Sequence, residues 1–366
     1  MTRLLDRIPE ALRALSAYSV PTPQGIEVKL DANEHPYALP RGAREELARE
    51  LAAVDINRYP TADCAELREL IADELDRPQD SLVFGNGSDE LISFLVTTFA
   101  RPREGASRPA ILYPVPTFSV FRLACTGLGA DPVEIPLGPD FELDPGAVEA
   151  ALARSRPNVA FFARPNNPTG TLWRRDLIAA LARNHPDVLF VSDEAYDDYC
   201  GDSMVDDLAH IENLAVMRTL SKIGLAGARV GFVSLAPALA TALEKVRTPY
   251  NVGSLNQCAA AWALREARET LRAQCAEVVR ERDALFGELE ALPGVHPFPT
   301  RANLILMRVG SPGDGMATQV WHRLCERGVL VRNLDADGPL SGCLRVTTGT
   351  PEENRRFLSA LSASLG

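Results

Sequence analysis

The sequence predicts an α/β fold, in which a large domain has a mainly parallel sheet flanked by helices and a smaller domain is α+β. Apolar strand segments alternate with helical segments at the spacing of βαβ units through the middle of the chain. Polar or glycine-rich turns follow these strands, and a second series of strands and helices leads to the C-terminus. A chain of 366 residues is long enough for two such domains.

Residues 1–30 are expected to form an N-terminal helix and a proline-rich arm. Charged residues alternate with apolar ones at the start of this segment, and Pro21 and Pro23 follow. Residues 41–54 and 65–75 are predicted to be helical, and the segment Arg58-Tyr-Pro60 separates these two helices.

Residues 31–250 are predicted to form the large domain. The expected strands cover 82–84, 110–113, 158–163, 188–192 and 215–220, with helices after Ser88 and from Thr171 onward. Ligands of open α/β sheets bind beyond the carboxyl ends of the strands. Asn167, Asp193 and Lys222 each follow a different predicted strand, so the sequence places a candidate site at that edge.

Residues 251–366 are predicted to form the small α+β domain. A long helix is expected over 257–292 and another over 316–327, with strands over 302–309, 329–333 and 343–348. The segment Thr350-Pro-Glu-Glu353 has an N-cap, a proline at N1 and an acidic N3 residue, which is typical of a helix start.

Charge and composition argue against several classes of partner. The net charge is −11, which disfavours binding to nucleic acid or to an anionic membrane. Seven cysteines without a C-x-x-C pair indicate reduced thiols and a cytoplasmic protein. The five histidines lack metal-ligand spacing, so no metal site is expected. The N-terminus lacks the uncharged core of a signal peptide, and no apolar run reaches the roughly 20 residues of a membrane span.

The segment from Thr219 to Gly231 carries the chemistry on which the interpretation depends. Lys222 ends an apolar strand that contains one arginine, and an amine at such a place loses its proton readily and can form a Schiff base. Ser221 and Arg229 offer a hydroxyl and a guanidinium fork for a phosphate. The other interpretation of this stretch is a solvated lysine followed by a glycine-rich turn.

Two further loops follow predicted strands. The turn Gly85-Asn-Gly-Ser-Asp-Glu90 opens a helix and offers backbone N–H groups to an anion, although a simple helix cap explains it equally well. Phe118, in a prolyl loop after the strand at 110–113, can present its ring to a flat ligand or belong to the core.

The ordered motifs resemble a known family. The set Pro165-Asn-Asn-Pro-Thr-Gly170, Asp193-Glu-Ala-Tyr196 and Ser221-Lys222 to Arg229 is similar to that of the fold-type I aminotransferases, which use pyridoxal 5′-phosphate. The flanking segments narrow the resemblance to the histidinol-phosphate aminotransferases, and it covers the chain from about Tyr18 to the last helix. These segments are Leu30-Asp-Ala-Asn-Glu34, Arg58-Tyr-Pro60, Gly85-Asn-Gly-Ser-Asp-Glu90, Val329-Leu-Val-Arg-Asn333 and Leu344-Arg-Val-Thr-Thr-Gly-Thr-Pro-Glu-Glu-Asn354.

The resemblance implies a role for each matched residue. Lys222 would hold the cofactor and move the proton, and Asp193 would pair with the protonated pyridine nitrogen. Asn167 and Tyr196 would hydrogen-bond the phenolate oxygen of the cofactor. Phe118, where relatives often have tyrosine, would stack on the ring. The phosphate of the cofactor would bind to the backbone region of Ser88 and Asp89 and to Ser221 and Arg229. In relatives the tyrosine at the position of Tyr59 reaches the cofactor from the partner subunit, which implies a homodimer with shared sites; the other interpretation of Tyr59 is an ordinary surface tyrosine.

The resemblance also implies the substrates, which are histidinol phosphate, glutamate and 2-oxoglutarate. Arg345 suits both a carboxylate and a phosphate, since a guanidinium fork matches either anion. The resemblance also implies a substrate-binding role for Asn33, in the matched segment Leu30–Glu34. Arg332, Tyr18 and Tyr250 are further candidates for the substrate phosphate, and an ordinary surface role for these three stays open.

Several alternatives compete with this interpretation. An aromatic aminotransferase or a threonine-phosphate decarboxylase of the same subgroup would share the cofactor residues. A non-catalytic regulator would need an added DNA-binding domain, for which the roughly 30 residues before the match leave no room. A nicotinamide dehydrogenase is disfavoured because Glu90 stands where the third glycine of the dinucleotide motif belongs.

Overall fold

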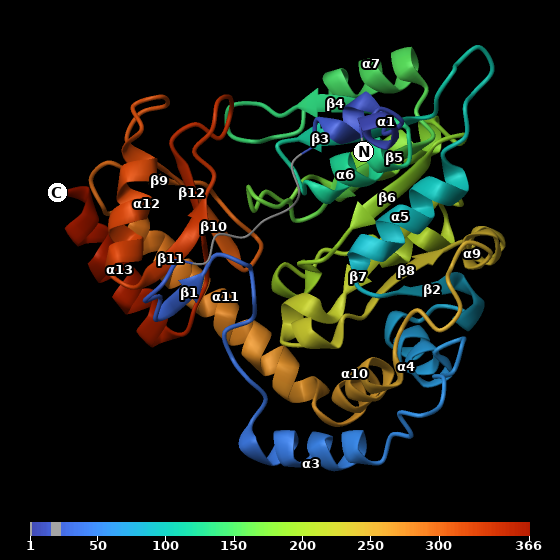
Figure 1. Cartoon of the computed structure of the whole chain (residues 1–366), viewed down its shortest axis with the longest axis horizontal. Coiled ribbons are helices and arrows are strands. Elements are labelled where there is room, and N and C mark those ends of the chain that lie inside the picture. The colour runs from blue at the N-terminus through green and yellow to red at the C-terminus, as the bar shows by residue number, and fades with distance from the viewer. Residues whose placement is uncertain (1, 16–22) are drawn as a thin grey trace.

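The computed structural model describes residues 2–15 and 23–366 and contains two β-sheets (Figure 1). One sheet has seven strands in the order β2-β8-β7-β6-β5-β3-β4, and the other has five in the order β1-β11-β12-β10-β9. The predicted α/β class, with a large mainly parallel sheet and a smaller mixed one, is confirmed. The domain limits at residues 30 and 250 stay predictions; β1 (Val28–Leu30) pairs with β11 (Val329–Asn333) of the smaller sheet.

The seven-stranded sheet brings the ends of its parallel strands to one edge. β4, β3, β5, β6 and β7 run parallel in that spatial order, whereas β8 is antiparallel to both of its neighbours. The strands are β2 (Leu82–Gly85), β3 (Ala110–Val115), β4 (Asp131–Pro136), β5 (Val159–Ala163), β6 (Leu189–Asp193), β7 (Leu214–Thr219) and β8 (Gly231–Leu235).

Helices cover both faces of this sheet, so its central strands are buried along their whole length. Phe161 and Phe162 show the alternation: Phe161 stacks on Phe121 of α6 with ring centroids 4.8 Å apart, and Phe162 meets Trp173 on the opposite face. One face carries α5 (Ser88–Phe99), α6 (Val120–Gly127) and α9 (Pro237–Glu244), and the other carries α7 (Pro145–Ser155) and α8 (Arg175–Asn184).

The smaller sheet packs against helices of the C-terminal part. Thr350 caps α13 with the predicted capping box, since its hydroxyl accepts from Glu353 N and its own N–H donates to Glu353 Oε2 at 2.8 Å. The elements are β9 (Val295–Pro297), β10 (Leu304–Val309), β12 (Cys343–Thr347), α12 (Met316–Glu326) and α13 (Pro351–Leu365).

Of the remaining helices, α2 contacts α6, and α3 and α4 pack against α10. Figure 1 shows α11 leading from α10 toward the smaller sheet. They are α1 (Thr2–Leu5), α2 (Glu10–Arg13), α3 (Arg41–Ala52), α4 (Ala65–Leu75), α10 (Ser254–Glu266) and α11 (Arg268–Glu290). None of the helices in the described part of the chain has the length and apolar character needed to cross a membrane.

Two predicted helices differ from the structure. The expected helix over 257–292 is two helices separated at Ala267, which lets α10 pack on α3 and α4 while α11 runs to the smaller sheet. The segment Thr171–Arg174 is not helical, and α8 begins at Arg175. Trp173 explains this: its indole N–H donates to Phe141 O and its carbonyl accepts from Arg164 Nε, so tertiary contacts override the local preference.

Candidate active site

The parallel strands bring Asn167, Asp193 and Lys222 to the same edge of the large sheet. Asp193 is the last residue of β6, Asn167 lies in the loop after β5, and Lys222 lies in the 3-10 turn Leu220–Ile223 after β7. Strands β5, β6 and β7 are neighbours and parallel, so their carboxyl ends coincide. Lys222 Nζ lies 5.8 Å from the ring centroid of Tyr196, which places the amine over an aromatic face.

Asp193 is a buried carboxyl group suited to a cationic partner. It is 4% exposed, and its Oδ1 accepts a 3.2 Å hydrogen bond from Ala195 N. Burial raises the pKa of Asp193 to about 7; the negative charges of Asp89 and Glu194 act in the same direction, while the Ala195 hydrogen bond and the Lys222 charge oppose it. A protonated ring nitrogen placed against this carboxyl would supply the compensating charge.

The hydroxyl of Tyr196 is held by Asn33, which follows β1 of the smaller sheet. Asn33 Nδ2 donates to the Tyr196 hydroxyl at 2.8 Å, and Asn33 N donates to Thr347 Oγ1 of β12 at 2.9 Å. Asn303 Nδ2 donates to Asn33 O at 3.2 Å. Asn33 adopts a left-handed conformation with φ of 55°, which asparagine tolerates better than most residues. The phenol of Tyr196 is therefore oriented by the segment that follows β1.

Arg345 joins the two sheets beside the site. It lies on β12, is 8% exposed, and its Nη1 donates to Asn167 Oδ1 at 2.6 Å while Nη2 donates to Asp31 O at 2.6 Å. Arg332 stands directly opposite Arg345 in the β11–β12 register, so both side chains share one face of the smaller sheet. Two of the predicted substrate residues thus lie on one surface, and one of them contacts a predicted cofactor residue.

A second group of hydrogen-bond donors gathers where α5 begins. Arg229 Nη1 donates to Ser221 Oγ at 3.3 Å and its Nη2 donates to Asp89 Oδ2 at 3.2 Å. The N-cap of α5 is Gly87, which has φ of 81° and makes no side-chain cap bond with the helix. A Cβ atom on Gly231 would lie 2.7 Å from Ser88 N, so only glycine lets β8 approach this turn. Donors at a helix start together with a guanidinium and a hydroxyl fit a phosphate.

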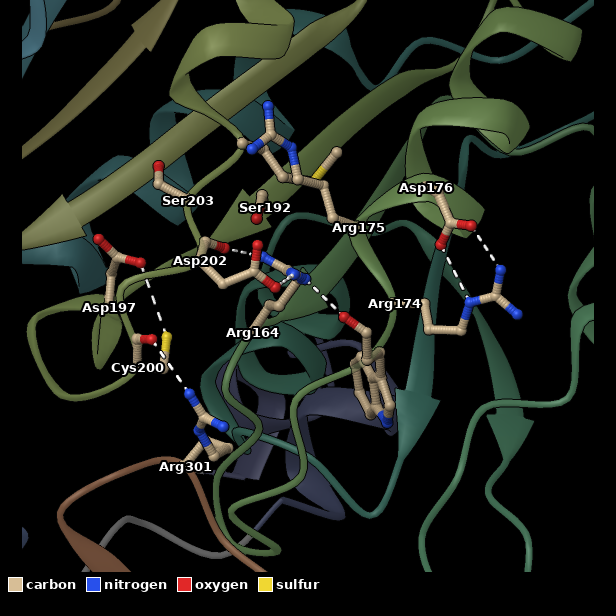
Figure 2. A network of polar contacts seen from close by, with 12 residues as sticks. Arg164, Arg174, Arg175, Asp176, Ser192, Asp197, Cys200, Asp202, Ser203 and Arg301 are labelled. Atoms are coloured by element: carbon tan, nitrogen blue, oxygen red, sulfur yellow. Dashed lines mark hydrogen bonds and ion pairs between the residues drawn. The ribbon is translucent and has the colours of Figure 1, made fainter. Parts of the chain in front are cut away.

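The loop that carries Asn167 is anchored by a buried arginine (Figure 2). Arg164 is fully buried; its Nη2 forms an ion pair with Asp202 Oδ2 at 2.5 Å, its Nε donates to Trp173 O at 2.6 Å, and its backbone N donates to Asp193 O at 2.7 Å. On the other side, Arg301 N donates to Gly170 O at 2.8 Å. These contacts tie the Asn167 loop to the end of β6 and to the segment before β10.

The other predicted residues lie in different surroundings. Phe118 is half-buried and meets Phe121 edge to face, with ring centroids 5.8 Å apart. Tyr59 and Tyr250 stack on each other with centroids 4.6 Å apart, and they are 81% and 42% exposed. Tyr18 lies outside the described residues. The described residues contain no group of three or more His, Cys, Asp or Glu able to hold a metal ion.

The sequence interpretation did not single out Glu194 and Arg218. Glu194 has a fully buried side chain, and Arg218 pairs with it from β7 at 3.1 Å. One signal for this pair was present, since Arg218 is the single charged residue in an otherwise apolar strand.

Comparisons with known proteins identify the family of the chain. Residues 26–361 match the family described as Aminotransferase class I and II. Histidinol-phosphate aminotransferase 2 of Cupriavidus pinatubonensis is 42% identical over 99% of this chain and 98% of its own length, and histidinol-phosphate aminotransferase 1 of Ralstonia nicotianae is 42% identical over 99% and 96%. The crystal structure of histidinol-phosphate aminotransferase from Sinorhizobium meliloti in complex with pyridoxal-5′-phosphate has the same fold, with a TM-score of 0.86, 23% identity and 98% of each chain covered. The resemblance seen in the motifs is confirmed, and the chain belongs to the class I and II aminotransferase family, among the histidinol-phosphate aminotransferases.

Proposed function

We propose that the protein is a histidinol-phosphate transaminase of histidine biosynthesis. It exchanges the amino group between L-histidinol phosphate and 2-oxoglutarate, giving imidazole acetol phosphate and L-glutamate. The observation that carries this proposal is the meeting of Lys222, Asp193 and Asn167 at one sheet edge, with Arg345 in contact with Asn167. Full-length identity of 42% with histidinol-phosphate aminotransferases supports the choice of substrate.

The site residues fit pyridoxal 5′-phosphate. This cofactor supplies an aldehyde for amines and a protonated ring that accepts an electron pair. Asp193 would pair with the ring nitrogen, because its buried carboxyl needs a cation. Ser221, Arg229 and the backbone of Ser88 and Asp89 at the start of α5 would hold the phosphate.

Each residue of the site has a proposed role in the reaction. Lys222 would hold the aldehyde through its amine and, once the substrate amine has displaced it, would carry the proton to and from the substrate carbon. Asn167 and Tyr196 would hydrogen-bond the phenolate oxygen, and Phe118 would stack on the ring. Arg345 would bind the carboxylate of glutamate or the phosphate of histidinol phosphate, exchanging its contact with Asn167 for the substrate. Asn33, Arg332, Tyr18 and Tyr250 complete the proposed substrate pocket.

Absorbance spectroscopy tests the substrate assignment. L-Histidinol phosphate added to the yellow protein should convert the cofactor to its amine form, and 2-oxoglutarate should restore the starting spectrum. If phenylalanine or tyrosine converts the cofactor and histidinol phosphate does not, the protein is an aromatic aminotransferase. Release of carbon dioxide from threonine phosphate would instead identify a decarboxylase. A protein that takes up no pyridoxal phosphate would contradict the whole proposal.

The substitution Gly87→Ala should weaken binding of pyridoxal phosphate. A Cβ atom there would lie 2.5 Å from Arg229 Nη2, and φ of 81° is strained for alanine, so the guanidinium must move. Losing one charge-assisted hydrogen bond costs about 1.5–3 kcal/mol, or roughly 10- to 100-fold in affinity. Equilibrium titration of the apoprotein measures this loss. Gly227→Ala, two residues before Arg229, is the control, because its Cβ atom would meet nothing within 4 Å; an equal loss there would contradict the assignment.

The protein is further proposed to be a cytoplasmic homodimer with shared active sites. Tyr59 is 81% exposed and stacked on Tyr250, an arrangement that an adjoining subunit would cover. All seven cysteines are free, which fits a reducing compartment. Sedimentation equilibrium should give twice the 39.7 kDa chain mass. Tyr59→Phe should preserve the dimer but weaken cofactor binding by about tenfold, since one phosphate hydrogen bond is lost. A monomeric, fully active enzyme would contradict this proposal.

A further inference from the structure

A buried ion-pair network lies directly behind the residues proposed to face the cofactor. Glu194 follows Asp193 at the end of β6, and its side chain is fully buried. Its carboxylate accepts hydrogen bonds from Ser203 Oγ at 2.6 Å, Met204 N at 2.8 Å and Ser192 Oγ at 3.1 Å. Arg218 donates to the same carboxylate through Nε at 3.3 Å and Nη2 at 3.1 Å. The charge of Glu194 is thus compensated where water has little access.

Arg218 also holds a second carboxylate. Its Nη2 lies 2.7 Å from Asp197 Oδ2, and the side chains of Arg218 and Asp197 are only 16% and 11% exposed. Figure 2 shows Asp197 in contact with Cys200. Ser192 and Ser203, which donate to Glu194, are drawn in the same view. One guanidinium therefore bridges two carboxylates that stand on either side of Ala195 and Tyr196.

This bridge positions the turn that contains Tyr196 relative to β7, the strand that precedes Lys222. Arg218 is on β7, four positions before Lys222, and Glu194 N donates to Met217 O of that strand at 2.8 Å. The planar fork of arginine can hold two acceptors in fixed directions, which a flexible ammonium cannot do. The turn between Asp193 and Asp197 is thereby fastened to β7, the strand that leads to Lys222.

We propose that Glu194, Arg218 and Asp197 form a positioning clamp that fixes Tyr196 for its hydrogen bond to the cofactor. The clamp touches neither cofactor nor substrate; it acts through the backbone of the turn. The phenol is held from the other side by Asn33 Nδ2 at 2.8 Å, so its position is defined by two independent supports. This inference rests on the proposed function, because it concerns the binding of pyridoxal phosphate derivatives.

A double-mutant cycle on cofactor affinity tests the clamp. The probe is pyridoxamine 5′-phosphate, which binds without a covalent bond to Lys222. Arg218→Lys keeps the positive charge but loses the fork, and it should weaken binding by about tenfold. In a protein that also carries Tyr196→Phe, the same change should cost less than about twofold, since residues acting as one unit are not additive. Asp197→Asn, an isosteric change at the other arm, should weaken binding in the same direction by about threefold.

Arg175→Lys is the matched control for a loss of general stability. Arg175 also faces two aspartates, with Nε 2.6 Å from Asp207 Oδ2 and Nη2 3.8 Å from Asp206 Oδ2, at the start of α8. It should lower the melting temperature without changing affinity for pyridoxamine 5′-phosphate. Equal losses for Arg218→Lys with and without Tyr196→Phe would overturn the clamp while leaving the proposed function intact. A wild-type protein that fails to bind the probe would overturn both.

Discussion

The substitution Lys222→Ala should reduce the rate of transamination by about 10⁴-fold or more, because one amine is proposed both to hold the aldehyde and to move the proton. The chain has two other lysines: Lys29 donates to Glu34 Oε2 at 2.7 Å, and Lys245 follows α9. Arg218 of β7, four positions before Lys222, is paired with Glu194 and Asp197. Single-turnover spectroscopy with L-histidinol phosphate measures the half-reaction directly.

Affinity for pyridoxamine 5′-phosphate separates a chemical defect from a binding defect in this variant. Lys222→Ala should bind the compound within about threefold of the wild type, because the hydrogen bonds of Arg229 to Ser221 and of Ala195 N to Asp193 do not involve the lysine side chain. Lys245→Ala, at an exposed lysine after α9, should leave both quantities unchanged. A Lys222→Ala rate within tenfold of the wild type would rule out the assigned role.

The central strands could be predicted from the sequence because they are buried on both faces. β5, β6 and β7 are short apolar runs, and each is followed by a polar motif, so both their type and their ends were recognisable. β4 and β8 were missed for physical reasons. β4 is an edge strand with a proline at each end and exposed polar residues, and β8 follows a glycine-rich turn and runs antiparallel to its neighbours.

The candidate site was predictable only in part. Asn167, Asp193 and Lys222 each follow a predicted strand, and parallel strands bring such residues to one edge of the sheet by a general rule. The contact of Asn33 with Tyr196 spans 163 positions and that of Arg345 with Asn167 spans 178, so no local pattern encodes them. The break at Ala267 was equally invisible, because neither glycine nor proline marks it.

Asp193→Asn should slow transamination by about 10²- to 10³-fold, since an amide cannot stabilise a proton on the ring nitrogen as a buried carboxylate does.

The same variant tests the electrostatics of the cofactor-free protein. The pKa of Asp193 is about 7 in the folded chain and 3.8 in its ordinary surroundings. Between these values the folded state keeps a proton that the unfolded state releases, so the free energy of unfolding falls as the pH rises from about 4 to 7.

Urea denaturation of both apoproteins at pH 5 and pH 8 measures this contribution. Relative to Asp193→Asn, the wild type should lose roughly 2–3 kcal/mol of stability over that interval, because each pKa unit corresponds to about 1.4 kcal/mol. Asparagine keeps the acceptor for Ala195 N, so the difference reports the charge rather than the lost hydrogen bond. Parallel pH curves for the two proteins would mean that Asp193 is ionised at pH 5 without the cofactor. A loss of roughly 2–3 kcal/mol relative to Asp193→Asn would mean that burial keeps Asp193 protonated at pH 5 in the cofactor-free protein.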